Sequence, residues 1–261
     1  MRKILTFVFF ILACAVNVFA QDAVQTKWKT SGILSSAYNQ TAVSSNWEGK
    51  ETYSRGWQLK FHLGVERDNE RTNWTTAFKE EYGETETRDS NSVSLDLIEF
   101  NTVFAYKAYK QLHIYASFYT LSQNNEFWDP VTYIESAGLS FDILKNAINT
   151  LTLRAGFALK QVDNSVTGNT RDTGAEAVLA YALLFHESAK FTSEARFYET
   201  FKNGETLRWE NKLFLKTGKY LTTIIGHVLH YDGSRMSADN WPHDIETLTY
   251  AALGFSFNIF Q

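Results

Sequence analysis

Residues 53–66 alternate between apolar and polar side chains, with Arg55 as the one exception, and this pattern constrains the fold more than any other feature of the chain. Trp57 and Leu59 lie on one phase, while Gln58 and Lys60 lie on the other. A period of two residues is that of a β-strand, because successive side chains point to opposite faces. The run is much longer than the usual strand of about 5 to 6 residues. The chain must therefore accommodate long strands with one apolar face.

Similar runs recur along the whole chain and predict an all-β fold, a single antiparallel transmembrane β-barrel of about twelve strands. The candidate strands cover residues 28–40, 53–66, 73–83, 93–107, 112–122, 131–143, 151–161, 175–185, 191–201, 207–216, 221–231 and 245–259. Each is long enough to cross a bilayer at a tilt, which takes about 9 to 11 residues. A soluble β-sandwich is the alternative, but its strands would be much shorter.

The beginning of the chain has the pattern of a secretory leader. A basic start is followed by an apolar run over residues 4–16, and small residues at positions 18 and 20 suit a signal peptidase. The run stops at Asn17, short of the roughly 20 apolar residues that a membrane anchor needs. We therefore expect a cleaved signal peptide over residues 1–20, a barrel domain over residues 21–261 and a location in the bacterial outer membrane.

Composition excludes several classes of protein. The net charge of -4 is small and mixed in sign, which argues against a nucleic-acid binder and a polybasic membrane-surface protein. The only cysteine, Cys14, lies in the leader, so the exported chain can have no disulfide and no cysteine nucleophile or metal ligand. Mean hydropathy is -0.28, a value compatible with a barrel because only alternate residues meet the hydrocarbon.

The connections alternate in length, as in barrels with short periplasmic turns and longer outer loops. The predicted short turns cover residues 67–71, 108–111, 145–149, 186–189 and 217–219. The predicted outer loops cover residues 41–52, 84–92, 123–130, 162–173 and 232–244. One outer connection is short: residues 202–204 suit a three-residue hairpin with Gly204 in the left-handed conformation.

This hairpin predicts the pairing of its two strands. Counting outward from the turn places Phe201 opposite Glu205 on the lipid side. On the inner side the same register places Arg196 opposite Glu210 and Glu194 opposite Lys212. Opposite charges directly across a strand pair stabilise it, so we expect a ladder of ion pairs inside the barrel.

The polar phase of the strands is expected to line the lumen. The candidate lumen-lining residues are Lys60, His62, Lys79, Asp96, Glu99, Arg154, Lys160, Glu176, Glu194, Arg196, Arg208, Glu210 and Lys212. A change of apolar phase near Leu97 and Ile98 predicts a β-bulge that turns both Asp96 and Glu99 inward. Two such carboxylates suit a cation site or an acid/base pair, whereas ion pairing to lumen lysines is the favoured reading.

Three carboxylates fall on the outward, apolar phase: Glu80, Glu135 and Glu199. We expect them near the outer ends of their strands, where charges are tolerated, with solvation at the rim favoured over contact with divalent cations among anionic lipids. Tryptophans expected in aromatic girdles are Trp28, Trp57, Trp74 and Trp209.

Several short motifs carry a family resemblance. They are Asn46-Trp47-x-Gly49, Asn73-Trp74, Tyr82-Gly83, Arg88 and Asp96. In this order they are similar to the N-terminal half of a family of uncharacterised outer-membrane β-barrels, akin to the salt-stress-induced outer-membrane type. The resemblance implies a barrel of unknown function and carries over no catalytic residue.

Catalytic signals are weak. There is no Gly-x-Ser-x-Gly elbow, and His227 and His230 would point to opposite faces of a strand, which disfavours a zinc pair. We expect no enzyme, cofactor or metal site, and as partners outer-membrane lipids and the barrel-assembly machinery. A narrow channel for small polar solutes or ions is the favoured function. The alternatives are a non-conducting barrel with a surface-binding or envelope-integrity role, and a lipid-modifying enzyme.

Overall fold

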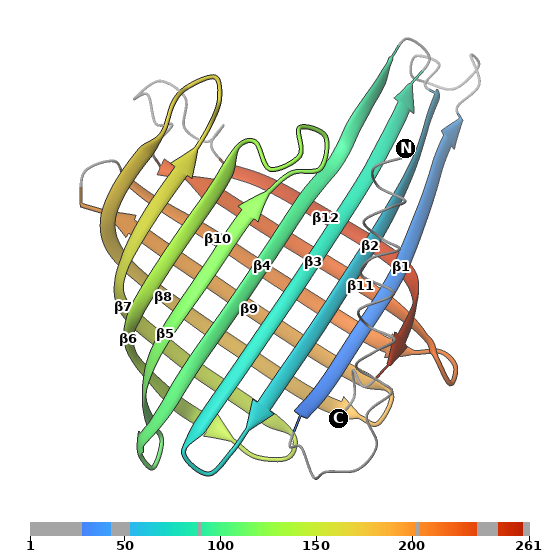
Figure 1. Cartoon of the computed structure of the whole chain (residues 1–261). Helices are drawn as coiled ribbons and strands as arrows, with labels where there is room; N and C mark the ends of the chain where they lie inside the picture. The colour runs from blue at the N-terminus through green and yellow to red at the C-terminus, as the bar shows by residue number, and fades with distance from the viewer. Residues whose placement is uncertain (1–27, 43–52, 88–89, 202–203, 234–244, 258–261) are drawn as a thin grey trace.

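The chain forms a closed antiparallel β-barrel (Figure 1). The structure is a computed structural model and describes residues 28–42, 53–87, 90–201, 204–233 and 245–257. Each strand pairs with its neighbours in the sequence, and β1 pairs with β12 to close the barrel through residues 32–36 and 253–257. The predicted fold class is confirmed. The predicted signal peptide lies outside the described residues.

The described residues form twelve strands. They are β1 (Trp28–Ala42), β2 (Tyr53–Asp68), β3 (Thr72–Thr87), β4 (Asn91–Tyr109), β5 (Leu112–Ser122), β6 (Val131–Lys145), β7 (Asn149–Asp163), β8 (Thr170–His186), β9 (Ala189–Thr200), β10 (Gly204–Lys216), β11 (Leu221–Asp232) and β12 (Ile245–Phe257). Among the described residues, no helix is long and apolar enough to cross a membrane.

An apolar belt covers the outside of the barrel because the apolar phase of every strand faces outward. Large exposed residues of this belt include Leu34, Phe104, Ile114, Leu139, Phe157, Leu179 and Phe255. Aromatic rows flank it: Trp28 and Trp74 pack at one end with ring centroids 6.0 Å apart, and Trp57 and Tyr82 pack at the other, 5.7 Å apart. A belt between aromatic rows is typical of barrels that span a membrane.

The two ends of the barrel differ in their connections. Turns of two to four residues join β2 to β3, β4 to β5, β6 to β7, β8 to β9 and β10 to β11. We call this the turn end and the opposite end the loop end. Residues 123–130 form a loop at the loop end as predicted. The predicted loop over residues 84–92 is wrong, because β3 and β4 continue pairing to Glu86 and Asn91. Figure 1 shows β3 and β4 rising above the connection between β5 and β6 at that end.

The hairpin between β9 and β10 has a different register from the predicted one. Gly204 has the expected positive φ, 93°, but it pairs with Thr200, so Phe201 belongs to the turn. The pairing is therefore shifted by two residues, which keeps every side chain on its predicted face. Arg196 lies opposite Arg208, and Glu194 lies opposite Glu210. The predicted ladder of directly opposed ion pairs is wrong.

The bulge in β4 also lies elsewhere than predicted. The register with β3 shifts between Gly83 and Glu84, which pair with Leu95 and Val93, so the extra residue is Ser94. Beyond this point the ladder is regular, and Asp96 and Glu99 fall on opposite faces because they are three residues apart. Glu99 pairs with inward Lys79, whereas Asp96 pairs with outward Tyr82, so the prediction that Asp96 lines the lumen is wrong. The carboxylate of Asp96 instead accepts hydrogen bonds from the backbone N–H groups of residues 124 and 125 in the loop.

Two expectations about outward residues also need correction. Glu80 lies near the middle of β3, because this strand extends to Thr87, and not toward its loop end. Trp209 lies near the middle of β10, where its indole N–H donates a hydrogen bond of 3.0 Å to Ser193. Glu199, at the loop end of β9, lies where it was predicted.

Candidate functional site

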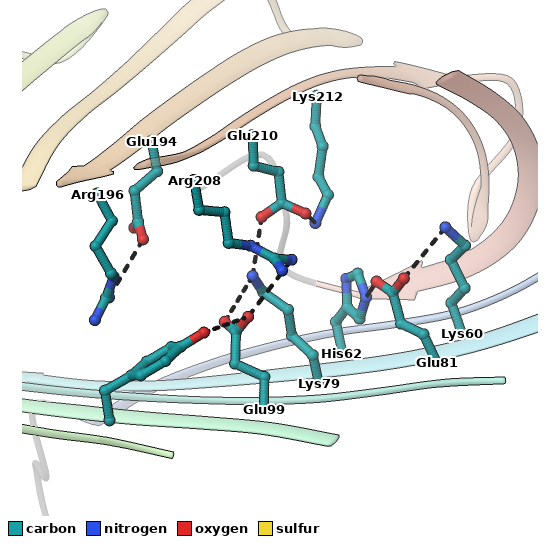
Figure 2. Close-up of polar contacts among 11 residues, drawn as sticks. Lys60, His62, Lys79, Glu81, Glu99, Glu194, Arg196, Arg208, Glu210 and Lys212 are labelled. Atoms are coloured by element: carbon teal, nitrogen blue, oxygen red, sulfur yellow. Dashed lines mark hydrogen bonds and ion pairs between the residues drawn. The ribbon is translucent and has the colours of Figure 1, made fainter. Parts of the chain in front are cut away.

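A network of ionised side chains occupies the middle of the barrel interior (Figure 2). Its members, which we call the interior network, are Lys60, His62, Lys79, Glu81, Glu99, Glu176, Glu194, Arg196, Arg208, Glu210 and Lys212. They come from β2, β3, β4, β8, β9 and β10 and lie on the polar phase of each strand. All except Glu81 are among the residues predicted from the sequence.

At one edge of the interior network, Glu81 holds two side chains of β2. Its carboxylate lies 2.6 Å from Nε2 of His62 and 3.3 Å from Nζ of Lys60. Nζ of Lys60 also lies 3.2 Å from the ring centroid of Tyr250 on β12. Lys60 is only 1% exposed, so its charge is stabilised by Glu81 and the tyrosine ring and not by solvent.

At the centre, Lys79 joins opposite walls of the barrel. Its Nζ lies 2.8 Å from Glu99 on neighbouring β4 and 2.9 Å from Glu210 on β10. Glu210 also binds Nζ of Lys212 at 2.8 Å, and Glu99 lies 3.7 Å from Arg208. Figure 2 shows the side chains of β3 and β4 meeting those of β10 across the interior. The Lys79–Glu210 and Glu99–Arg208 contacts connect strands that do not pair with each other.

On the far side, Arg196 of β9 binds two carboxylates. It lies 3.0 Å from Glu176 on β8 and 3.4 Å from Glu194 on its own strand. Its guanidinium lies 4.1 Å from the ring centroid of Tyr119 on β5, and the Tyr119 hydroxyl donates to Glu99. Arg196 therefore links the carboxylates of the β8–β9 wall to the centre through an aromatic ring.

Two predicted interior residues lie apart from the interior network. The guanidinium of Arg154 lies 5.2 Å from the ring centroid of Tyr115, and Nζ of Lys160 lies 5.6 Å from that of Tyr198. Both tyrosines are almost fully buried. Tyr119 and Tyr198 also pack with Ile134 and Ala158 in an apolar cluster. Large aromatic rings thus fill interior space that the ionised groups leave.

Little space remains between the side chains at the centre of the interior network. The cavity among Lys79, Glu99, Tyr119, Glu194, Arg196, Arg208 and Glu210 has a volume of about 10 Å³. A site needs about 10 to 15 Å³ to hold one water molecule. The space among these seven side chains is therefore about that of a single water molecule.

Charge is balanced across the interior network, which contains five cationic side chains and five carboxylates besides His62. The interior network itself therefore adds no net field of one sign to concentrate anions or cations. In the described part of the chain, no cluster of three His, Cys, Asp or Glu residues has an arrangement that could hold a metal ion.

Glu81 is the member that sequence reasoning missed. It follows Glu80 directly, and only the phase of the strand tells which of the two carboxylates faces inward. Lys79 on one side and Gly83 on the other lie on the same inward phase as Glu81. This period-two relation to Lys79 is the signal that would have found it.

Comparisons with known proteins give a family match over part of the chain. A family model described as "Protein of unknown function (DUF3078)" matches residues 38–126. The predicted resemblance to an uncharacterised family is confirmed over that span, while the likeness to a salt-stress-induced type stays a prediction. No curated protein matches the chain.

Solved structures similar to this chain are barrels of low sequence identity. The translocator domain of the autotransporter NalP from Neisseria meningitidis has 8% identity and a TM-score of 0.44, covering 97% of this chain and 95% of that one. An outer-membrane channel from Pseudomonas putida F1 has 8% identity and a TM-score of 0.49, covering 91% and 98%. The NanC porin has 11% identity and a TM-score of 0.47, covering 88% and 100%.

Proposed function

We propose that this protein is an outer-membrane β-barrel whose interior is closed at rest, so that it does not conduct solutes and acts through its outer surface and loops. The observation that carries this proposal is Lys79, which binds Glu99 and Glu210 on opposite walls and leaves about 10 Å³ between the surrounding side chains. Of the functions that the sequence suggested, a non-conducting barrel with a surface-binding or envelope-integrity role fits this geometry best.

The membrane location is supported by three features that are independent of the interior. The sequence begins with the pattern of a secretory leader. The outward faces of the strands form an apolar belt. Aromatic rows containing Trp28 and Trp74 at the turn end and Trp57 and Tyr82 at the loop end flank this belt. With the short turns on the periplasmic side, the loop end faces the cell exterior.

A channel function would require the interior network to separate. Lys79, Arg208 and Lys212 each contact a carboxylate of the same cluster, so moving one side chain aside leaves a buried charge without its partner. A constriction made by one flexible residue could open by rotation of that side chain alone, whereas this one opens only if several ion pairs separate together. We therefore expect the interior to stay closed in the resting protein.

Single-channel recording in planar bilayers tests the proposal. The refolded wild-type barrel should give no current steps above those of the bare membrane. The triple variant Lys79→Ala, Arg208→Ala, Glu210→Ala removes the side chains that meet at the centre and should conduct. A matched variant, Glu187→Ala, Lys216→Ala, Lys219→Ala, makes the same charge changes at exposed turn-end positions and should stay silent.

Stable wild-type conductance at low voltage would overturn the closed barrel and support the narrow channel. Heat-modifiable gel migration of each preparation shows whether the barrel has folded before its current is measured. Membrane fractionation of the expressed chain tests the location separately.

A further inference from the structure

Three inward side chains form a row near the turn end of the barrel. His113 on β5 pairs with Ser140 on β6, and Ser140 pairs with Arg154 on β7. We call these three residues the turn-end row. His113 is 6% exposed and Ser140 is 7% exposed. The row therefore places buried polar groups next to one another on neighbouring strands.

Each member of the turn-end row lacks a hydrogen bond that its chemistry allows. Nδ1 of His113 and Nε of Arg154 are buried and have no hydrogen-bond partner among the described residues. Within the same ranges, the hydroxyl of Ser140 makes no hydrogen bond. A buried polar atom without a partner costs free energy. Three such groups in one row indicate that a water molecule or a ligand completes their bonding.

The charge of Arg154 distinguishes a ligand from water. Its guanidinium lies 5.2 Å from the ring centroid of Tyr115, and it forms no ion pair with any residue that the structure describes. Glu176 on neighbouring β8 is engaged by Arg196 at 3.0 Å and by the hydroxyl of Ser136. Water could complete the hydrogen bonds of the row, whereas an anion would also balance this charge.

The side chain of Arg154 reaches across β6 toward the other two members of the row. It starts on β7, but the ring that it contacts belongs to Tyr115 on β5, two residues from His113 on the same face. The residue of β6 that pairs with Tyr115 is Gly138, which has no side chain. The guanidinium can therefore lie over β6, close to Ser140. Polar groups from three strands converge there.

Asp142 orients the imidazole of His113 at the edge of this site. Its carboxylate lies 3.1 Å from Nε2 of His113 and accepts a hydrogen bond of 3.1 Å from the hydroxyl of Thr152. Because Nε2 is engaged, Nδ1 is the nitrogen left for a ligand. Nζ of Lys145 lies 3.4 Å from the same carboxylate, and the lysine side chain is 56% exposed. The turn-end row thus lies next to the solution at that end of the barrel.

We propose that the turn-end row binds one phosphate group, either free phosphate or the phosphate of a small monoester, which enters from the turn end. A guanidinium suits a phosphate because it can donate two parallel hydrogen bonds. The hydroxyl of Ser140 donates to a further oxygen. In its singly protonated form a phosphate has both an O–H group and acceptor oxygens. It can therefore bond Nδ1 of His113 whether that nitrogen accepts or donates.

This site goes beyond the proposed function and does not depend on closure of the barrel. A carboxylate is the competing class of anion. It is planar, has two oxygens and has no proton to donate when ionised. It can satisfy the guanidinium of Arg154 but leaves Ser140 or His113 without a partner, so the three-strand arrangement favours phosphate.

Isothermal titration calorimetry of the refolded full barrel in detergent tests the site. The probes are inorganic phosphate, glycerol 3-phosphate and acetate, compared at equal ionic strength. Wild type should bind one inorganic phosphate per barrel and should bind acetate about tenfold more weakly, the effect of losing one hydrogen bond to a charged group. Binding of glycerol 3-phosphate would show that the site accepts esters, and its absence would identify free phosphate as the ligand.

Variants with matched controls locate the binding. Ser140→Ala should weaken phosphate binding about tenfold, and Arg154→Gln should weaken it at least about thirtyfold because a charge pair is lost. Lys160→Gln removes another inward cation of β7, which also lies near a tyrosine ring, that of Tyr198 at 5.6 Å. Ser117→Ala removes another inward hydroxyl, on β5. Both controls should bind phosphate as wild type does.

Heat-modifiable gel migration shows whether each variant has folded before it is titrated. A folded wild-type barrel that binds no phosphate would overturn the site. Acetate bound as tightly as phosphate, or equal weakening by Lys160→Gln and Arg154→Gln, would overturn it as well. The outcome is separate from that of the proposed function. A barrel that conducts yet binds phosphate loses only closure, and a silent barrel that binds none loses only the site.

Discussion

Removing the Lys79 side chain should destabilise the folded barrel by about 3 kcal/mol, the lower end of the cost of breaking a buried ion pair. The structure sets this magnitude. The side chain of Lys79 is 17% exposed and contacts two carboxylates, Glu99 at 2.8 Å and Glu210 at 2.9 Å. Neither carboxylate is left wholly alone, because Arg208 remains beside Glu99 and Lys212 remains beside Glu210.

Urea unfolding of the refolded barrel in lipid vesicles, followed by tryptophan fluorescence, measures this difference for Lys79→Ala. The matched control is Lys216→Ala, which removes a lysine from the exposed end of β10. Surface substitutions of this kind change stability by within about 0.5 kcal/mol.

A double-mutant cycle isolates the contact across the interior. Adding Glu210→Gln to the Lys79→Ala background removes a carboxylate that has already lost its Lys79 partner, so the double variant should lose less than the sum of the single variants. Additive effects, or a Lys79→Ala barrel as stable as the Lys216→Ala control, would refute the claim that Lys79 ties opposite walls together.

Three further predictions concern the loop end. Gly204→Ala should cost about 1 kcal/mol in urea unfolding, because φ at this position is 93°; unchanged stability would contradict the turn geometry. Asp96→Ala removes the acceptor of two backbone hydrogen bonds from residues 124 and 125, and their amide exchange should accelerate about tenfold. Hydrogen bonds from the side chain and backbone of Ser165 lower the pKa of Asp129. This contact should therefore be complete above the usual aspartate pKa of about 3.9 and be lost as pH falls through the lowered value. The Ser165 amide chemical shift should follow that titration and should not follow it in Asp129→Asn.

The positions of the strands follow from the sequence because alternation is a local property. The predicted limits of β5, residues 112–122, coincide with those of the structure. The ends of strands that extend beyond the apolar belt are harder to predict. Both faces of the strand are polar there, so the sequence shows no alternation between apolar and polar residues. Residues 84–87 of β3 are polar on both phases, so the sequence predicts a loop there, although residues 84–86 pair with β4.

Register depends on single residues at turns, and the sequence leaves their assignment ambiguous. Whether Phe201 ends β9 or begins the turn changes the pairing of the whole hairpin by two positions, yet it changes no face. Hydrophobic pattern therefore predicts the inward set well and its partners poorly. The predicted position of the β4 bulge is wrong for another reason. The prediction assumes that apolar residues face lipid, but Leu95 and Leu97 fall on the inward phase of β4.

Contacts across the interior lie beyond any local signal. Lys79 and Glu210 are 131 positions apart and belong to strands that never pair. Their meeting depends on strand number, tilt and stagger together, because these set which inward residues share a level of the barrel. The sequence predicts that both residues face inward, and the closed barrel decides that they touch.

The register of the β9–β10 hairpin shows why barrel closure and the interior network depend on each other. Taken alone, this hairpin places Arg196 opposite Arg208 and Glu194 opposite Glu210, and directly opposed like charges destabilise a strand pair. Within the hairpin, Glu194 contacts Arg196 and Lys212 contacts Glu210. Further compensating charges come from elsewhere: Glu176 on β8 for Arg196, Glu99 on β4 for Arg208, and Lys79 on β3 for Glu210. The contacts from β3 and β4 exist only after the barrel has closed. Closing the barrel thus relieves repulsion that its own hairpin creates, and the side chains that relieve it are those that block the lumen.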